Sequence, residues 1–352
     1  MSAGLRLLFL LPFSPQAGVG NATTARRLCN GLKRFGHSSE CMQVPADLRP
    51  AADGQWQFPA DLQTAAKNAD VIVALHAVKA APAAVALAQS NGCKTVVLFT
   101  GTDLNGKPPA WALQAVKAAE ASVALSPPTL KRAREKFQCT NVQMIVQAAA
   151  PLPEPRGGAA MPKHAPKLAG EDFLIFLPSG LRPVKAPRRG IQALRKLAAR
   201  RPEIRLWIAG MELDADEAAA VKADVAKFKW AEYVGALTQT EMAAVMRRAN
   251  LVLSTSRSEG GAPNCLLEAA LFAKPIAASN IAVHRFFPGQ RRLFQEDSDL
   301  VRMVEHCLQE PQMEALEARQ LREETRTRFD RTKEAVSWDR LLRKVANPPV
   351  TE

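Results

Sequence analysis

The chain has 352 residues, of which 47% are apolar and 23% are charged, and its formal net charge at pH 7 is +13. At about 150 residues per domain, this length predicts two globular domains that each bury a core. The charge favours an anionic partner such as a phosphate group, although basic side chains that only solvate helix surfaces give the same total. Aromatic residues make up 6% of the chain, which argues against a nucleic-acid partner held by base stacking.

The cysteines and the N-terminus favour a cytoplasmic protein. The chain has six cysteines, at positions 29, 41, 93, 139, 265 and 307. None forms a CxxC pair or a zinc-binding spacing, so we interpret them as reduced core residues. An apolar run at residues 5–12 precedes a glycine-containing turn and an amphipathic helix, which favours a buried strand over a signal peptide. No run approaches the roughly 18 apolar residues of a membrane span.

Strand and helix patterns alternate over the first 150 residues. Apolar runs predict strands buried on both faces at residues 7–11, 71–75, 95–99, 123–125 and 142–146. A helix at 21–35 carries one apolar stripe, and Gly36 suits its C-cap. Parallel strands joined by crossover helices are the assembly that this alternation predicts.

The alternation restarts after residues 151–170, which hold five prolines and three glycines and are typical of a linker. We expect further strands at 173–177, 204–209, 232–234, 251–254 and 275–278, and helices at 187–200, 215–228, 239–249 and 264–273. The tail is helical and charged. Its last helix carries an apolar stripe, which needs a surface to pack on, at Trp338, Leu341, Leu342 and Val345.

The predicted fold is therefore α/β, with two Rossmann-like, doubly wound domains facing a cleft. The expected boundaries are 1–150 for the first domain, 151–170 for the linker, 171–330 for the second domain and 331–352 for a closing helix. Sheets of this kind bind ligands at the carboxyl ends of their strands. The motifs that follow all lie at such strand ends.

In the first domain, a glycine-containing loop joins the first strand to its helix. Gly18, Gly20 and Asn21 suit the approach of an anion to a helix N-terminus, although a tight turn explains the glycines equally well. Thr23 stands where the dinucleotide-binding fingerprint requires a third glycine. The loop alone therefore does not identify a ligand.

Polar residues also follow two other strands of the first domain. His76 ends one strand, where either a structural role or acid–base chemistry is expected. Thr102 and Asp103 follow the next strand and suit the hydroxyl groups of a sugar, with an Asx-type turn as the alternative.

A basic loop follows the first strand of the second domain. Gly180 precedes Arg182, whose guanidinium can bind phosphate oxygens in pairs, and Lys185, which adds a point charge. Two cations at this position can stabilise a leaving diphosphate without a metal ion. A basic surface loop without a ligand is the alternative interpretation.

A second loop of this domain carries two carboxylates. Glu259 precedes Gly260 and Gly261, and Glu268 lies in the next helix after the apolar Leu267. A carboxylate that is half-buried among apolar residues is costly unless it binds hydroxyl groups or cations. The pair would suit the hydroxyl groups of a sugar and a ribose.

Asp214 and Asp216 form a DxD pair of the kind that can hold a divalent metal with a sugar nucleotide. They open a predicted surface helix, where acidic residues are expected because of the helix dipole. The sequence offers no other convincing metal cluster, so we predict no metal site and no cofactor.

Taken in order, these motifs resemble those of the retaining glycosyltransferases with two Rossmann-like domains, the GT-B type, in the group 1 or family 4 class. The matching segments are GNATTARRLCNGLKRFGH, SGLRPVK, EGGAPNCLLEA, KPIAASN and SWDRLLRKV. The resemblance covers nearly the whole chain and is strongest over 172–282. The segments ALHAVKAA, LFTGTDLN and GLRPVKAP narrow it to a subgroup, and the first two also resemble bacterial selenosugar synthases.

The resemblance implies a hexosyltransferase-like enzyme that uses a nucleoside diphosphate sugar, by default a UDP-sugar, in a metal-independent transfer with retention. Its catalytic residues would be Arg182, Lys185, Glu259 and His76. Substrate or nucleotide would be bound by Gly18, Gly20, Asn21, Thr102, Asp103, Gly180, Gly235, Leu237, Gly260, Gly261, Leu267 and Glu268. The closing helix would return to the first domain. Gly235 to Leu237 would lie near the base.

One departure from the family pattern keeps alternatives open. The family places seven residues between its two glutamates, whereas eight separate Glu259 from Glu268. A catalytically impaired sugar-nucleotide-binding protein is therefore an alternative, as is an epimerase or phosphorylase with this architecture. No nucleic acid is expected as a partner, and peripheral contact with an anionic membrane stays open. The sequence leaves the donor base, the sugar, the acceptor and the oligomeric state undetermined.

Overall fold

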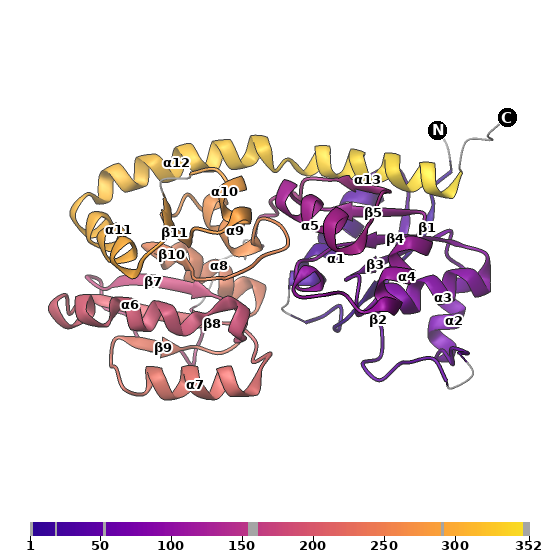
Figure 1. The fold of residues 1–352 in the computed structure, drawn as a ribbon. Helices are drawn as coiled ribbons and strands as arrows, with labels where there is room; N and C mark the ends of the chain where they lie inside the picture. Colours follow the sequence, from indigo (N-terminus) through magenta and orange to yellow (C-terminus); the bar gives the residue numbers. More distant parts are fainter. Residues whose placement is uncertain (1–2, 18–19, 52–53, 154–160, 290–291, 348–352) are drawn as a thin grey trace. The chain divides into compact units, whose positions relative to one another are not determined.

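The computed structural model describes residues 3–17, 20–51, 54–153, 161–289 and 292–347 (Figure 1). Gly18 and part of the expected linker lie outside these ranges. The chain divides into two compact units. The first unit comprises Met1–Ala148, Glu259–Gly261 and Phe329–Glu352, and the second comprises Ala149–Ser258 and Ala262–Arg328.

The first unit is built on a parallel sheet of six strands in the order β2-β1-β3-β4-β5-β6. The strands are β1 Arg6–Leu11, β2 Ser38–Gln43, β3 Val71–Leu75, β4 Lys94–Leu98, β5 Ala121–Ala124 and β6 Val142–Met144. The five predicted strands are present, and β2 is the one that the sequence analysis missed. β2 is an edge strand with the polar sequence SSECMQ, so it lacks the apolar run that marks its neighbours.

Helices cover both faces of this sheet. They are α1 Gly20–Leu32, η1 Lys33–Phe35, α2 Ala60–Lys67, α3 Ala81–Asn91, η2 Thr102–Leu104, α4 Ala110–Ala118, α5 Pro127–Phe137 and α13 Arg331–Ala346. Gly36 caps η1 with a φ of 81°, at the position expected for a helix end. Contacts with the strands place α3 on one face and α1 and α13 on the other.

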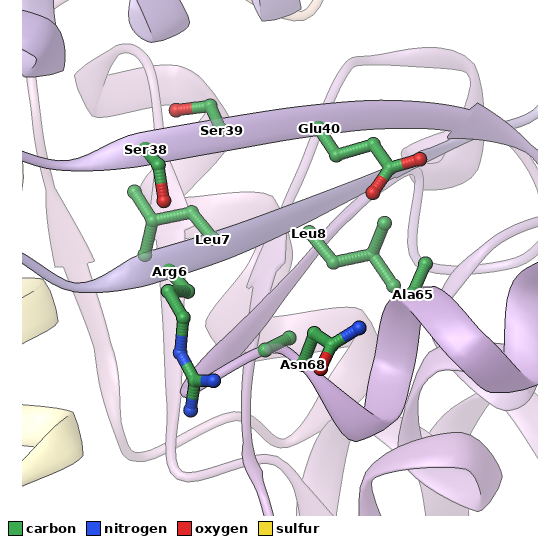
Figure 2. Close-up of a pocket in the computed structure, with 9 residues that line it drawn as sticks. Arg6, Leu7, Leu8, Ser38, Ser39, Glu40, Ala65 and Asn68 are labelled. Carbon is green, nitrogen blue, oxygen red and sulfur yellow. The ribbon is translucent and has the colours of Figure 1, made fainter.

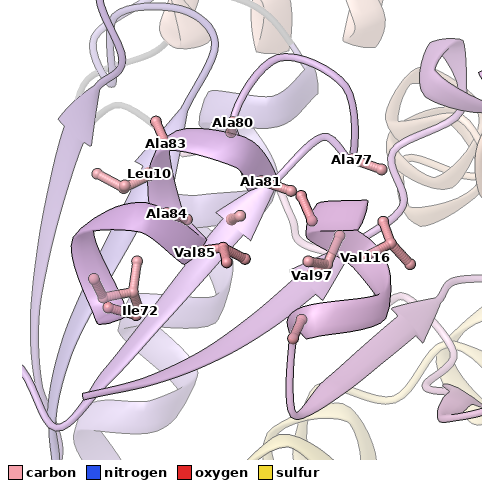
Figure 3. Close-up of a cluster of buried hydrophobic side chains, with 14 of the residues drawn as sticks. Leu10, Ile72, Ala77, Ala80, Ala81, Ala83, Ala84, Val85, Val97 and Val116 are labelled. Atoms are coloured by element: carbon pink, nitrogen blue, oxygen red, sulfur yellow. The ribbon is translucent and has the colours of Figure 1, made fainter. Parts of the chain in front are cut away.

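Alanine dominates the core between the sheet and α3. Figure 3 shows Ala81 and Ala84 of α3 beside Ile72 and Val97 of the strands, all fully buried. Small side chains let the helix backbone approach the sheet closely, which tightens packing although each alanine buries little apolar area.

Helix α13 is held to the first unit by buried charges and by its apolar stripe. The Arg27 guanidinium donates to both carboxylate oxygens of Glu334 at 2.9 and 3.0 Å, and both side chains are at most 4% exposed. His37 Nδ1 accepts the Leu5 amide, so Nε2 carries the proton that faces Asp339 at 2.8 Å. Of the stripe that the sequence indicated, Trp338 and Leu342 are fully buried.

The second unit repeats the architecture with strand order β12-β11-β10-β7-β8-β9. Its strands are β7 Phe173–Pro178, β8 Ile204–Ala209, β9 Ala231–Tyr233, β10 Leu251–Ser254, β11 Ile276–Ser279 and β12 Leu293–Phe294. Its helices are η3 Pro183–Lys185, α6 Pro187–Arg200, α7 Ala215–Val225, α8 Gln239–Arg248, α9 Asn264–Leu271, α10 Ala282–Phe286, α11 Asp297–Gln309 and α12 Pro311–Arg328. The predicted strands are all present to within a residue at each end. Helix α7 ends three residues earlier than predicted.

Each sheet has a point at which the strand order reverses. In the first unit the chain passes from β1 to β2 and then returns to the other side of β1 as β3. In the second it runs from β7 to β9 and returns beside β7 as β10. Ligands of open α/β sheets bind at the carboxyl side of such a reversal. Within the described residues, no helix combines the length and the apolar character needed to cross a bilayer.

We predict that Glu334→Ala lowers the free energy of unfolding of the first unit by about 3 kcal/mol or more, because it leaves the Arg27 charge buried without its carboxylate. The double variant Arg27→Met, Glu334→Leu should lose much less, since it removes both charges. Urea denaturation measures both values.

Glu135→Ala is the matched control, because its ion pair with Lys131 is exposed and should contribute less than about 0.5 kcal/mol. A loss for Glu334→Ala no larger than that of Glu135→Ala would contradict the importance of the buried pair.

Candidate functional site

The basic loop after β7 has a fixed backbone. Leu181 donates its amide to the Met211 carbonyl at 2.8 Å and accepts the Leu213 amide at 3.1 Å. Gly180 packs closely there, since a Cβ atom would lie 2.8 Å from Leu213 Cδ1 and would displace the end of that side chain. Arg182 follows in an extended conformation, and η3 brings Lys185 one turn later. Both cations are half-buried at the carboxyl end of β7.

Two hydrogen bonds join this loop to the loop that follows β10. The Thr255 hydroxyl donates to the Lys185 carbonyl at 3.0 Å, and the Arg257 amide donates to the Val184 carbonyl at 2.8 Å. The basic loop is therefore held across the strand-order reversal, beside the segment that leads to Glu259.

Helix α9 begins at the same edge, after β10. Glu268 lies on its fifth residue and is half-buried. Leu267, which the sequence analysis grouped with the binding residues, is 1% exposed, so its side chain packs in the core and only its backbone could contact a ligand. The helix packs on β10, β11 and α12, which fixes the direction of its N-terminus.

Glu259, Gly260 and Gly261 are grouped with the first unit, whereas the sequence analysis placed them in the second domain. Arg132 of α5 donates to the Glu259 carbonyl at 2.9 Å, and the Thr129 hydroxyl donates to the Gly260 carbonyl. Partial burial lowers the pKa of the Arg132 guanidinium, which stays protonated because its ordinary value is so high.

Gly260 has no room for a side chain. A Cβ atom at this position would lie 2.2 Å from the Thr100 carbonyl oxygen, and one at Gly101 would lie 2.4 Å from the Gly260 nitrogen. The two glycines thus allow a direct approach of one backbone to the other.

Glycines also end the neighbouring strands of the second unit. The Gly210 amide donates to the Gly235 carbonyl at 2.9 Å, and a Cβ atom on Gly210 would lie 2.2 Å from the Ser179 carbonyl oxygen. Gly235 has a φ of 72°, and the half-buried Leu237 follows it before α8. Sequence reasoning missed Gly210, although a glycine directly after a buried strand was the signal that could have found it.

In the first unit, His76 has a φ of 113°, which is unusual for a residue with a side chain. Its Nδ1 accepts the amides of Val78 and Lys79 at 3.2 and 3.1 Å. The ring proton therefore lies on Nε2, which donates to the Thr102 hydroxyl oxygen at 3.0 Å. In this arrangement the Thr102 hydroxyl accepts from His76 and does not use its own proton in that bond.

Asp103 binds backbone. Its carboxylate accepts the amides of Ala77 at 2.9 Å, Gly101 at 2.7 Å and Thr100 at 3.1 Å, and the residue is 2% exposed. The carboxylate does not form the Asx-type turn that the sequence left as an alternative, because such a turn bonds the amide two residues after the aspartate, whereas these amides precede Asp103 in the chain. It links the ends of β3 and β4 and so fixes the spacing of His76 and Thr102.

The remaining candidates lie at helix starts. Gly20 begins α1, where Asn21 is half-buried in the first turn. Asp214 is the N-cap of α7, and its side chain accepts the Glu217 amide at 2.9 Å, as expected for acids at a helix start. Over the described ranges, three or more His, Cys, Asp or Glu residues nowhere gather as metal ligands would.

A surface hollow of about 230 Å³ lies away from these residues (Figure 2). It is lined by the first halves of β1 and β2 and the end of α2, with Arg6, Ser38, Glu40 and Asn68 among its polar residues. The predicted site residues lie at the carboxyl ends of the strands, so this hollow does not belong to the candidate site.

We predict that Asp103→Asn lowers the free energy of unfolding of the first unit by about 2 kcal/mol or more, because it replaces a buried acceptor of three amides by a neutral group with one fewer acceptor. Thr102→Val should cost less than about 1 kcal/mol, since Thr102 is partly exposed. Chemical denaturation of the two variants checks this difference. Equal losses would show that Asp103 does not brace the strand ends.

Comparisons with known proteins bear on the family and the fold. Residues 172–310 match the family described as glycosyl transferases group 1. HepE of Anabaena in complex with UDP-glucose is similar in structure, with a TM-score of 0.68 and 16% identity over 96% of this chain and 99% of that chain.

Two further solved structures are similar over nearly the whole chain. Sucrose-phosphate synthase of Thermosynechococcus elongatus has a TM-score of 0.71 at 15% identity, covering 97% of this chain and 98% of that chain. A glycosyltransferase of Rickettsia africae has a TM-score of 0.70 at 14% identity, covering 98% and 99%. The chain therefore has the two-domain α/β fold of GT-B glycosyltransferases, and its residues 172–310 are similar to the group 1 glycosyl transferases.

Proposed function

We propose that this protein transfers a sugar from a nucleoside diphosphate sugar to an acceptor, with retention at the anomeric carbon and without a metal ion. The observation that carries this proposal is the pair of hydrogen bonds that hold the Arg182–Lys185 loop beside the loop after β10. The family match over residues 172–310 supports it. HepE is described in complex with UDP-glucose, which supports a UDP-sugar as the donor.

The second unit would bind the donor. Arg182 presents a planar fork to the diphosphate, and Lys185 adds a point charge one turn later. The backbone at Gly180 can approach the phosphates closely, because glycine has no side chain to stand between them. Glu268 would accept the ribose hydroxyl groups, and Gly235 to Leu237 would border the base.

The sugar would be bound by Glu259 and by the backbone amides of Gly260 and Gly261. The carbonyl groups of Glu259 and Gly260 are already bonded to Arg132 and Thr129, which fixes the loop backbone. A fixed backbone can present its amides to hydroxyl groups without further ordering, which lowers the entropy cost of binding.

The first unit would supply contacts to the acceptor or the sugar. The Thr102 hydroxyl, whose oxygen accepts from His76, would donate to a ligand, and Asp103 fixes the strand ends that carry both residues. Gly20 and Asn21 at the start of α1 would face the phosphates or the sugar.

Departure of the diphosphate would leave negative charge on its oxygens, where Arg182 and Lys185 stabilise it. A phosphate oxygen would take the acceptor proton on the face of attack, so that no protein nucleophile is needed. We propose a cytoplasmic location, which the free thiols of the six cysteines support.

We predict that Lys185→Ala lowers the rate of sugar transfer about a hundredfold, because it removes one of two charges that stabilise the leaving diphosphate. Turnover of a radiolabelled UDP-sugar measures the rate. Lys196→Ala, an exposed lysine on the following helix α6, is the matched control and should keep the parent rate.

A Lys185→Ala rate within about threefold of the parent, less than about 1 kcal/mol of barrier, would count against the proposed role. Circular dichroism of both variants verifies that they are folded.

The eight-residue spacing between Glu259 and Glu268 favours one second candidate, a sugar-nucleotide-binding protein without activity. Calorimetry with UDP-glucose and product analysis on the same sample separate the two functions. We expect both binding and release of UDP. Tight binding with no release in the presence of a broad panel of acceptors would support the inactive alternative.

A further inference from the structure

Two cysteines of the first unit lie in contact. Cys29, in the last part of α1, and Cys41, in the middle of β2, have their sulfur atoms 3.4 Å apart. Cys29 is 8% exposed, and Cys41 is half-buried. Strand β2 pairs Cys41 with Phe9 of β1, and α1 packs on both strands, so the sheet and the helix hold the two thiols together.

The pair differs chemically from an isolated buried thiol. One sulfur donates a hydrogen bond to the other, and this bond lowers the pKa of Cys29. Lys33, one helical turn further on, acts in the same direction by its positive charge. The hydrogen bond and burial raise the pKa of Cys41. Because the Lys33 charge favours the Cys29 thiolate, we assign Cys29 as the nucleophile and Cys41 as the neighbour able to react with what forms on it.

We propose that Cys29 and Cys41 are a site of oxidative modification, at which a hydroperoxide converts two thiols into an intramolecular disulfide. This inference does not depend on the proposed function.

The chemistry balances in two steps. The Cys29 thiolate attacks one oxygen of hydrogen peroxide, the O–O bond breaks, and Cys29 becomes a sulfenic acid while the other oxygen leaves as hydroxide and takes a proton to form water. The Cys41 thiol then attacks the Cys29 sulfur, the S–O bond breaks, and a second water leaves as the disulfide forms. Each peroxide is reduced by two electrons, which the two thiols supply. Hydrogen peroxide is small enough to reach a mostly buried sulfur.

The geometry requires little movement. The sulfur atoms must approach from 3.4 Å to about 2.05 Å, the length of a disulfide bond. Other thiols of this unit face oxygen atoms instead: Cys93 contacts the Ala88 carbonyl, and Cys139 contacts the Asn141 side chain. Within the part of the chain that the structure describes, neither of these two cysteines contacts a second thiol, so they serve as internal controls.

A disulfide between Cys29 and Cys41 would link α1 covalently to the edge strand β2. Helix α1 begins at Gly20 in the candidate site and carries Arg27, which holds α13 through Glu334. A covalent tie at Cys29 would restrict separation of the helix from the sheet in the unfolded chain, so the oxidised unit should be more stable than the reduced one.

The experiment treats the full chain with hydrogen peroxide at equimolar concentration and maps its cysteines by non-reducing peptide mass spectrometry. We expect a peptide pair joined through Cys29 and Cys41, with the loss of two hydrogen atoms and full reversal by dithiothreitol. Oxidation should also raise the Tm of the first unit by about 4 °C.

Cys29→Ser and Cys41→Ser should each abolish the linked peptide and the Tm shift, whereas Cys93→Ser and Cys139→Ser should keep both. Cys41→Ala repeats the test if the serine variant is unstable. The proposal is overturned if the parent gives only sulfinic acids on separate cysteines, or if it gives a different linked pair.

Discussion

The arrangement of the candidate site depends on two hydrogen bonds between loops that the sequence separates by about 70 residues. Thr255 and Arg257, after β10, bind the carbonyl groups of Lys185 and Val184, after β7. The strands are neighbours because the chain returns beside β7 after completing β9. This reversal leaves both loops at one sheet edge, and the hydrogen bonds convert that proximity into a fixed geometry for Arg182 and Lys185. A flexible basic loop would have to order itself on each binding event.

In the first unit, neighbouring strand ends are fixed by a buried side chain and not by hydrogen bonds between loop backbones. The Asp103 carboxylate accepts amides from the ends of both β3 and β4. Asp103 therefore contributes to the candidate site by fixing the positions of His76 and Thr102. Helix α13, which is distant in sequence, covers the face of the first sheet that lies opposite α3. The buried ion pair of Arg27 and Glu334 holds it there. The core of the first unit therefore includes side chains from residues 331–346.

Much of this fold could be predicted, because parallel strands buried on both faces leave apolar runs. Ile72 and Ile175 lie in such runs. Strand β2 could not be predicted in this way, because an edge strand that pairs with only one neighbour needs no continuous apolar run. Among the site residues, Gly260 was predictable, because a Cβ atom there would lie 2.2 Å from the Thr100 carbonyl oxygen and only glycine fits so close a backbone approach. The hydrogen bonds of the Asp103 carboxylate to backbone amides could not be predicted, because an exposed acidic residue in a turn and a buried one have the same sequence pattern. Likewise, Glu259–Gly261 join the first unit through contacts with α5 that the sequence does not encode locally.

The most direct test of the central claim is a crystal structure of the protein with UDP. We expect the diphosphate oxygens to contact Arg182 and Lys185 at the carboxyl end of β7, with the ribose near Glu268. UDP bound elsewhere with these side chains turned away from it, or the absence of binding at millimolar UDP, would contradict the assignment of this loop as the donor site.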